Sequence, residues 1–304
     1  MRPTELAGKA LAAFDGFQAR HKAVAFSVAV SKKFGEDRAG GMAALLAYYG
    51  FFALFPLLLV LVTVLGFVLQ GHPAQQASVL AAAKRDFPSL ADYLKVGSIS
   101  GSGLALGIGI LAALWAGLGV AGAAQQAMNT IWGVPRNDQP NMWKSRLRSL
   151  ALLATLGSAL VLSTAASALN GIGGSFAALF TLVGTVAPLV LNLALYLLAF
   201  RLLTVEPLSW RDVLPGAVAG AVTWTLLQWL GGYYTRHVIA HASHIYGTFA
   251  VVIGLLTWLH LGAQTTLYAA EANSVIRDKL WPRRLTTPSV EEQTEADTAE
   301  TGRN

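Results

Sequence analysis

The stretch IYGTFAVVIGLLTWLHLGAQTTLYAAEAN, residues 245–273, decides the fold of this chain. Residues 245–270 of it contain no Lys, Arg, Asp or Glu. A helix needs roughly 20 consecutive apolar residues to cross a bilayer, and this run is longer. The stretch therefore predicts a transmembrane helix, around which we expect the other apolar segments to pack.

The polar side chains of this predicted helix lie on one face. At 3.6 residues per turn they project within an arc of about 80°, and we call them the polar stripe: Tyr246, Thr257, His260, Gln264, Tyr268 and Glu271. An ionisable group at membrane depth is costly, so the stripe should face protein or water. It is either a surface that contacts a substrate or a set of polar contacts that hold neighbouring helices together.

The composition assigns the chain to the polytopic membrane proteins. Of its 304 residues, 54% are hydrophobic and 12% are charged, and the mean hydropathy is +0.52. Soluble domains carry about 25% charged residues. The absence of cysteine excludes disulfides, thiolate metal ligands and a cysteine nucleophile.

Six apolar segments are long enough to span a membrane, which predicts an all-α fold with six transmembrane helices. Their approximate bounds are 43–69, 103–132, 147–169, 176–203, 213–234 and 245–272.

Three segments lie outside these spans. Residues 1–40 place apolar side chains at helical spacing among Lys and Arg, so we expect amphipathic helices that lie on the membrane surface or pack against the ends of the spans. Residues 70–102 are too polar to span and predict an extracytoplasmic helical cap. Residues 277–304 are polar and acidic and predict a disordered tail.

Proline and glycine mark special positions within the spans. Pro56 and Pro188 predict a kink or break, and the backbone groups of broken helices often line cavities in transporters. Gly216 and Gly220 have the spacing of close helix contacts. The sequence also matches a dinucleotide-binding fingerprint, but within a long apolar helix pattern, so we interpret its glycines as packing positions too: Gly117, Gly119 and Gly122.

The distribution of positive charge predicts the orientation. Most Lys and Arg lie before the first span, after the second, after the fourth and after the last, whereas the opposite side has only Lys84, Arg85, Lys95 and Arg236. By the positive-inside rule both termini are cytoplasmic. Topology thus accounts for the net charge of +6, and we expect no nucleic-acid partner.

Three stretches together resemble the YihY/BrkB family of bacterial inner-membrane proteins. They are FGEDRAGGMAALLAYYGFFALFPLLLVLV at 34–62, AMNTIW at 127–132, and 246–273 of the last span. The usual GAE of the family stands here as AAE, at 269–271. The resemblance implies six spans with cytoplasmic termini. It also implies an envelope function, since members have been called virulence or serum-resistance factors, linked to lipid transport, and named ribonuclease BN.

No enzymatic site is predicted. A ribonuclease needs clustered metal ligands or acid/base groups, and the acidic residues on the predicted cytoplasmic side are scattered: Glu36, Asp37, Asp138, Glu206, Asp212, Glu271 and Asp278. The one histidine cluster has a spacing that could hold zinc or copper: His237, His241 and His244. Because this segment contains no carboxylate, we expect unliganded histidines and no cofactor.

The sequence favours transport or handling of an envelope lipid or other amphipathic substrate. The polar stripe would line an intramembrane cavity with polar residues of two other spans: Asn192, Tyr196 and Gln228. Glu271 and His260 would bind a cationic or hydrogen-bonding headgroup or relay a proton. Alternatively Glu271 is structural and pairs with Arg201 or with the basic loop after the second span, which carries Arg136, Lys144, Arg146 and Arg148. The competing function is a non-transporting scaffold for envelope assembly, with protein partners bound through 70–102 and the N-terminal region.

Overall fold

The computed structural model describes residues 15–18, 20–68, 103–168, 177–234 and 248–282. These residues form helices and connecting turns and contain no strand, which confirms the all-α class. The helices are α2 (Lys22–Glu36), α3 (Ala39–Val68), α5 (Gly103–Ile131), the short 3-10 helix η2 (Arg136–Asp138), α6 (Met142–Ala168), α7 (Ala177–Leu203), α8 (Trp210–Tyr234) and α10 (Thr248–Arg277).

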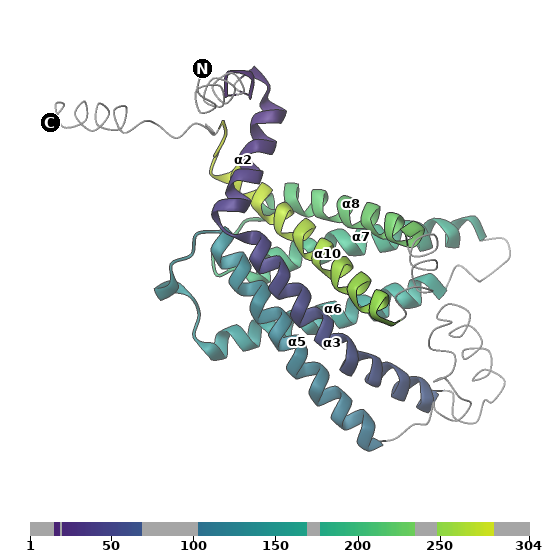
Figure 1. The fold of residues 1–304 in the computed structure, drawn as a ribbon. Coiled ribbons are helices and arrows are strands. Elements are labelled where there is room, and N and C mark those ends of the chain that lie inside the picture. The colour runs from purple at the N-terminus through teal and green to yellow at the C-terminus, as the bar shows by residue number, and fades with distance from the viewer. Residues whose placement is uncertain (1–14, 19, 69–102, 169–176, 235–247, 283–304) are drawn as a thin grey trace.

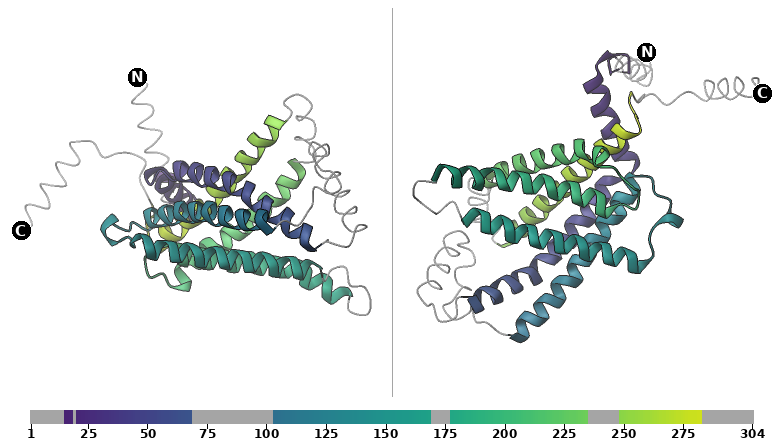
Figure 2. Two further views of the ribbon diagram at one scale, coloured as in Figure 1. Left: turned by 90° about the horizontal axis from the view of Figure 1, so that it is seen from below. Right: turned by 180° about the vertical axis from the view of Figure 1, so that it is seen from behind.

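The long helices lie side by side, and α10 occupies a central position (Figure 1). It contacts α3 on one side, α8 on the other, and α2 at its C-terminal end. Figure 2 gives the same arrangement from below and from behind. We call the end of the bundle where α2 packs the α2 end, and the positive-inside count predicts it to be cytoplasmic.

The bundle exposes an apolar surface. Trp115 is 83% exposed and Leu104 is 78% exposed, both on α5, and many large apolar side chains of α3 and α8 are also exposed. An apolar surface of this extent is typical of a protein that contacts lipid. By length and hydropathy, two stretches within the described residues qualify as membrane spans, Ala39–Val64 and Gly103–Ile131. The remaining spans of the six stay a prediction.

The helices run unbroken through two prolines. α3 is continuous over Pro56 and α7 is continuous over Pro188, so the alternative of a break at these positions is wrong, and a kink stays a prediction. A proline removes one backbone donor, and a membrane helix tolerates this loss when local adjustment satisfies the freed carbonyl groups. Broken helices therefore do not contribute to any cavity at these positions.

Four of the five glycines singled out from the sequence act as packing positions, and the prediction is wrong for Gly122. A Cβ atom at Gly216 would overlap the backbone oxygen of Ala269 in α10, and one at Gly220 would come within 2.8 Å of the Tyr196 ring in α7. The predicted close approach at these two glycines is confirmed. In α5, a Cβ atom would meet Leu153 at 3.0 Å from Gly117 and Tyr49 at 3.1 Å from Gly119, whereas Gly122 has nothing within 4 Å.

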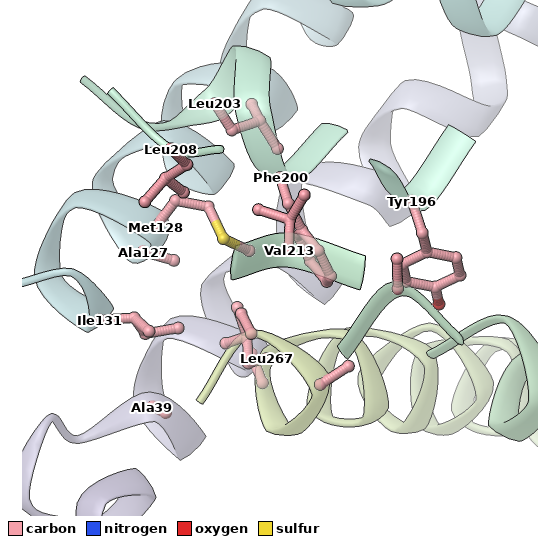
Figure 3. Packing of buried hydrophobic residues seen from close by; sticks show 14 of the residues in the cluster. Ala39, Ala127, Met128, Ile131, Tyr196, Phe200, Leu203, Leu208, Val213 and Leu267 are labelled. Atoms are coloured by element: carbon pink, nitrogen blue, oxygen red, sulfur yellow. The ribbon is translucent and has the colours of Figure 1, made fainter. Parts of the chain in front are cut away.

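The hydrophobic core lies near the α2 end (Figure 3). Met128 and Ile131 of α5 pack there with Phe200 of α7, Val213 of α8 and Leu267 of α10. All five side chains are fully buried, at 1% exposure or less. The helix ends that carry the polar groups described below are therefore held by a rigid apolar cluster.

The helix α2 buries an apolar face of its own. Ala29 and Val30 pack with Val275 of α10, and Phe26 lies edge-on to Trp281, with ring centroids 5.7 Å apart. The residues 277–282 are therefore part of the folded chain, and the predicted start of the disordered tail at 277 is too early. Leu280 and Trp281 supply apolar anchors, and the mainly polar sequence begins only after them.

A capping box starts α8 and gives a prediction about acid. The Asp212 carboxylate accepts a hydrogen bond from the Ser209 backbone N–H at 2.8 Å, and the Ser209 hydroxyl oxygen accepts one from the Asp212 N–H at 3.3 Å. These hydrogen bonds with Ser209 lower the pKa of Asp212 below the usual value of an aspartate. The depressed pKa stabilises the fold above the unfolded-state pKa, and this contribution is lost as pH falls through the folded-state pKa.

We expect Ser209→Ala to lower the free energy of unfolding by about 1 kcal/mol at neutral pH. Asp212→Asn should remove the part of the acid-induced loss of stability that comes from protonation of Asp212. Unfolding curves of wild type and both variants across the acid range check this, and identical acid sensitivity in Asp212→Asn would contradict it.

Candidate functional site: a buried polar junction and the stripe of α10

The last turns of α10 bury three polar side chains. Glu271 and Asn273 are fully buried, and Ser274 is 1% exposed. Small residues between and before them, Ala269, Ala270 and Ala272, leave room for neighbouring helices to approach. Buried polar groups require partners, and these come from α2, α5 and α8.

Lys33 of α2 is the partner of Glu271. Its ammonium lies 2.9 Å from Glu271 Oε2 and 2.5 Å from Asp37 Oδ2, and it donates a hydrogen bond to the Ile131 carbonyl oxygen at 2.7 Å. The Lys33 side chain is only 11% exposed. A lysine ammonium has three donors, and all three acceptors lie within reach.

The C-terminus of α5 completes the junction. The helix ends at Ile131, and Gly133 follows with φ +63°, a left-handed conformation that glycine adopts at little cost. The Ile131 carbonyl, left without a partner in its own helix, accepts hydrogen bonds from Lys33 and from the Ser274 hydroxyl at 3.3 Å. One atom of α5 thus binds both α2 and α10.

Two asparagines join further elements at this level. Asn273 Oδ1 accepts from the Gly216 N–H at 2.5 Å, and its Nδ2 donates to the Val213 carbonyl at 3.1 Å, so α10 is fixed to α8. Asn129 of α5 accepts from the Val205 N–H at 3.0 Å. We call the set Lys33, Asp37, Glu271, Asn273, Ser274 and the Ile131 carbonyl the polar junction.

The polar junction contains more negative than positive side-chain charge. Glu271 and Asp37 share the one ammonium of Lys33, and among the described residues Glu271 Oε1 has no hydrogen-bond partner. Such a site suits a cation or a hydrogen-bond donor and is unfavourable for an anion.

An aromatic stack lies beside the polar junction. The rings of Phe34 in α2 and Tyr268 in α10 are parallel within 2°, with centroids 3.9 Å apart. Phe34 is buried, while Tyr268 is 39% exposed. The stack therefore separates the buried end of α10 from its more open part.

Basic residues at the α2 end have other partners. Arg277 forms an ion pair with Glu206 at 2.8 Å, and this hydrogen bond raises the pKa of Arg277. Its guanidinium also lies 5.4 Å from the Trp132 ring centroid. Arg201 stacks over the Trp210 ring at 4.2 Å. The proposed pairing of Glu271 with Arg201 is therefore wrong, because Lys33 occupies that position.

The polar stripe is exposed or half-buried over most of its length, Tyr268 included, and is fully buried at Glu271 at the α2 end. Thr257 is exposed and donates to the Ile253 carbonyl of its own helix at 2.8 Å, whereas His260 and Gln264 are half-buried and Glu271 is fully buried. Tyr246 lies outside the described residues. The stripe is thus one face of α10 with an open part and a closed end.

In the part of the chain that the structure describes, the three predicted site residues of α7 and α8 do not form hydrogen bonds with the polar stripe. Asn192 donates to the Ala221 carbonyl at 3.3 Å, and the Tyr196 hydroxyl lies 3.2 Å from the Thr266 hydroxyl of α10. Gln228 is exposed. Within the described residues, no hydrogen bond joins any of them to a stripe residue, and Asn192 and Tyr196 bond to neighbouring helices instead.

The predicted histidine cluster, His237, His241 and His244, lies outside the described residues. Among the residues that the structure does describe, no group of three or more His, Cys, Asp or Glu is placed to hold a metal ion.

Sequence reasoning missed Lys33, Asn129 and Asn273. The spacing of Lys33 and Asp37, four residues apart on one helix, was a visible signal of an ion pair. Nothing local identified the asparagines, because their partners are backbone groups from distant segments, with Gly216 lying 57 positions from Asn273.

Several known proteins have sequences similar to that of this chain, and most of those compared are named as membrane proteins. The chain is 27% identical over 253 residues to YfkH of Bacillus subtilis, whose name describes it as ribonuclease-like, covering 77% of this chain and 88% of that protein. It is 29% identical over 274 residues to a UPF0761 membrane protein of Stenotrophomonas maltophilia, covering 84% of this chain and 61% of that longer protein. It is 23% identical over 274 residues to the inner membrane protein YhjD of Escherichia coli, covering 83% of this chain and 80% of that protein.

No solved structure matches the chain. The family described as Virulence factor BrkB matches residues 30–294, which include α3 to α10 and the whole polar junction. The chain is therefore a membrane protein of the BrkB family.

Proposed function

We propose that the protein binds and moves an amphipathic envelope molecule, such as a lipid, along the polar stripe of α10. In this proposal α2 closes one end of the path, and both termini are cytoplasmic. The observation that carries the proposal is a helix face that is open along most of its length and closed at one end. Thr257 and Tyr268 are exposed, His260 and Gln264 are half-buried, and Glu271 at the α2 end is buried.

The closed end has the features of a contact that can open. Lys33 and Phe34 belong to α2, a separate helix that packs on α10 through a small set of side chains. A cationic or hydrogen-bonding headgroup suits the excess carboxylate of the polar junction. An apolar tail would remain on the exposed apolar surface of the helices.

We propose no catalytic role. Four acidic side chains of the α2 end have structural partners. Glu271 and Asp37 pair with Lys33, Glu206 pairs with Arg277, and Asp212 caps α8. A hydrolase would need carboxylates or histidines that are available to water or metal.

A non-transporting scaffold is the second candidate. It is favoured by the internal hydrogen bonds of Thr257 and Asn192, which satisfy these polar groups within the protein. In that case the polar stripe serves helix packing.

The absence of cysteine allows a direct test of closure by α2. We would make Phe34→Cys together with Tyr268→Cys, whose rings are in contact, and reconstitute the protein in vesicles of phosphatidylethanolamine and phosphatidylglycerol with a trace of fluorescent phosphatidylethanolamine. We expect movement of the fluorescent lipid between leaflets when the pair is reduced. Oxidation should stop that movement, because it fixes α2 on α10.

The matched control is Gly117→Cys with Leu153→Cys, which joins α5 to α6 and should leave movement unchanged on oxidation. His260→Leu and Gln264→Leu should slow movement without loss of folded protein. Equal movement in the oxidised and reduced pair would contradict closure by α2. If wild type moves no more lipid than empty vesicles do, lipid movement is excluded and the scaffold is favoured.

A further inference from the structure

A polar hollow of about 470 Å³ lies between the end of α5, the loop that follows it and the start of α6. Its lining consists of carboxamides, hydroxyls, a proline and a glycine: Gly122, Gln125, Gln126, Asn129, Thr130, Gln139, Pro140 and Ser145. No lining residue is charged, and none has a large apolar side chain. The volume falls within the range of small-molecule sites, about 300–1,000 Å³.

Part of this lining is fixed by internal hydrogen bonds. Gln125 donates to the Ser145 carbonyl at 3.0 Å and to the Ser149 hydroxyl at 2.8 Å, and its oxygen accepts from the Ser145 hydroxyl at 2.7 Å. The carboxamide of Gln125 is therefore saturated and serves to hold α6 against α5. The wall of the hollow is thus rigid before any ligand binds.

The remaining polar groups are available to a ligand. The Gln126 side chain is exposed and forms no hydrogen bond within the described residues. Asn129 is 4% exposed and uses its oxygen for the Val205 N–H, which leaves its Nδ2 donors for the hollow. The Thr130 hydroxyl donates to the Gln126 carbonyl at 3.0 Å and keeps its acceptor capacity. These groups lie one turn apart on one face of α5.

The chemistry of this set selects a class of ligand. Carboxamides and a hydroxyl supply both donors and acceptors without charge, and this matches neutral hydroxyl groups, which also donate and accept. An apolar ligand would leave the buried Asn129 donors unsatisfied, and an ionic group would find no opposite charge in the lining.

The position of the hollow points to a membrane-facing ligand. It is formed by the last turns of Gly103–Ile131, a stretch that qualifies as a membrane span, so it lies where a span meets the headgroup layer. Trp143 at the start of α6 is 78% exposed, as expected of an aromatic residue at a membrane interface. Lys144, exposed and adjacent in sequence to the lining Ser145, can meet a phosphate outside the hollow.

We infer that this hollow binds the hydroxyl-rich headgroup of a phosphate-bearing ligand, with Gln126, Asn129 and Thr130 contacting the hydroxyls. The same chemistry occurs in a polyol-headed phospholipid and in a free polyol phosphate. The site is separate from the polar stripe of α10 and does not depend on movement of any substrate along it.

The test uses the full-length protein in detergent and two lipids that differ only in hydroxyls. Dioleoyl phosphatidylglycerol and dioleoyl phosphatidylpropanol carry the same charge, the same chains and a three-carbon headgroup, but only the first has free headgroup hydroxyls. Native mass spectrometry should show about tenfold tighter binding of phosphatidylglycerol, which corresponds to one or two hydrogen bonds of about 1 kcal/mol each. Gln126→Leu and Thr130→Val should each reduce this preference severalfold.

The control is Thr223→Val on α8, where the threonine is exposed and bonds to the carbonyl four residues earlier, as Thr130 does. It should keep the full preference. Added glycerol 1-phosphate separates the two sources of ligand: competition at concentrations similar to the lipid indicates a free polyol phosphate, and its absence indicates the lipid headgroup. Equal binding of both lipids by wild type would overturn the inference, as would an unchanged preference in both hollow variants.

Discussion

Replacing Lys33 with methionine is expected to destabilise the protein by about 3–5 kcal/mol. The substitution preserves the length of the aliphatic chain but removes the ammonium that neutralises Glu271, whose side chain is fully buried. It also leaves the Ile131 carbonyl with one hydrogen bond fewer. An uncompensated carboxylate in a buried site is far more costly than the loss of a surface ion pair.

Thermal unfolding of the purified protein in detergent measures this effect. Lys22→Met is the matched control, because Lys22 lies on the exposed face of the same helix, and it should stay within about 0.5 kcal/mol of wild type. Adding Glu271→Leu to Lys33→Met removes the unpaired charge and should recover much of the loss. If Lys33→Met and Lys22→Met unfold alike, the ion pair does not stabilise α2 on α10.

Replacing Gly216 with alanine is expected to cost about 3 kcal/mol or more, at the upper end for overpacked sites. The added Cβ atom would overlap the Ala269 carbonyl oxygen and approach the Asn273 side chain. A backbone oxygen within a helix cannot rotate away, so α8 and α10 must separate. That separation also breaks the hydrogen bond from the Gly216 N–H to Asn273.

Gly107→Ala is the control that shows whether the loss of stability in Gly216→Ala comes from close packing. A Cβ atom at Gly107 of α5 meets nothing within 4 Å, so Gly107→Ala should be neutral or slightly stabilising through helix propensity. Relative to wild type, Gly216→Ala should therefore lower the unfolding temperature, whereas Gly107→Ala should leave it unchanged or raise it slightly. Equal and small effects would show that α8 and α10 tolerate a wider separation at Gly216.

The sequence was sufficient to predict the helices but not the contacts between them. The apolar segments predicted helices whose bounds differ from the structure by a few residues, as in 213–234 against α8, Trp210–Tyr234. The extra turn at the start of α8 comes from the capping box, which a hydropathy pattern does not detect. Gly216 and Gly220 were identified because spacing alone indicates close approach.

The site was predicted only in part, for a physical reason. Periodicity placed the polar stripe on one face of the last long helix, because periodicity depends on neighbours along one helix. Which end of that face is buried depends on α2, whose Lys33 lies far from Glu271 in sequence. The expected pairing with Arg201 failed because charge alone cannot distinguish one basic residue from another.

The double hydrogen bond at the Ile131 carbonyl has a consequence for how the chain is made. Lys33 and Ile131 leave the ribosome long before Ser274, which follows Ile131 by 143 residues. Until α10 is synthesised, Lys33 lacks Glu271, and Ile131 lacks the Ser274 hydroxyl. The earlier helices therefore enter the bilayer as an incomplete set, and only the arrival of the last long helix lets α2 dock in its final place.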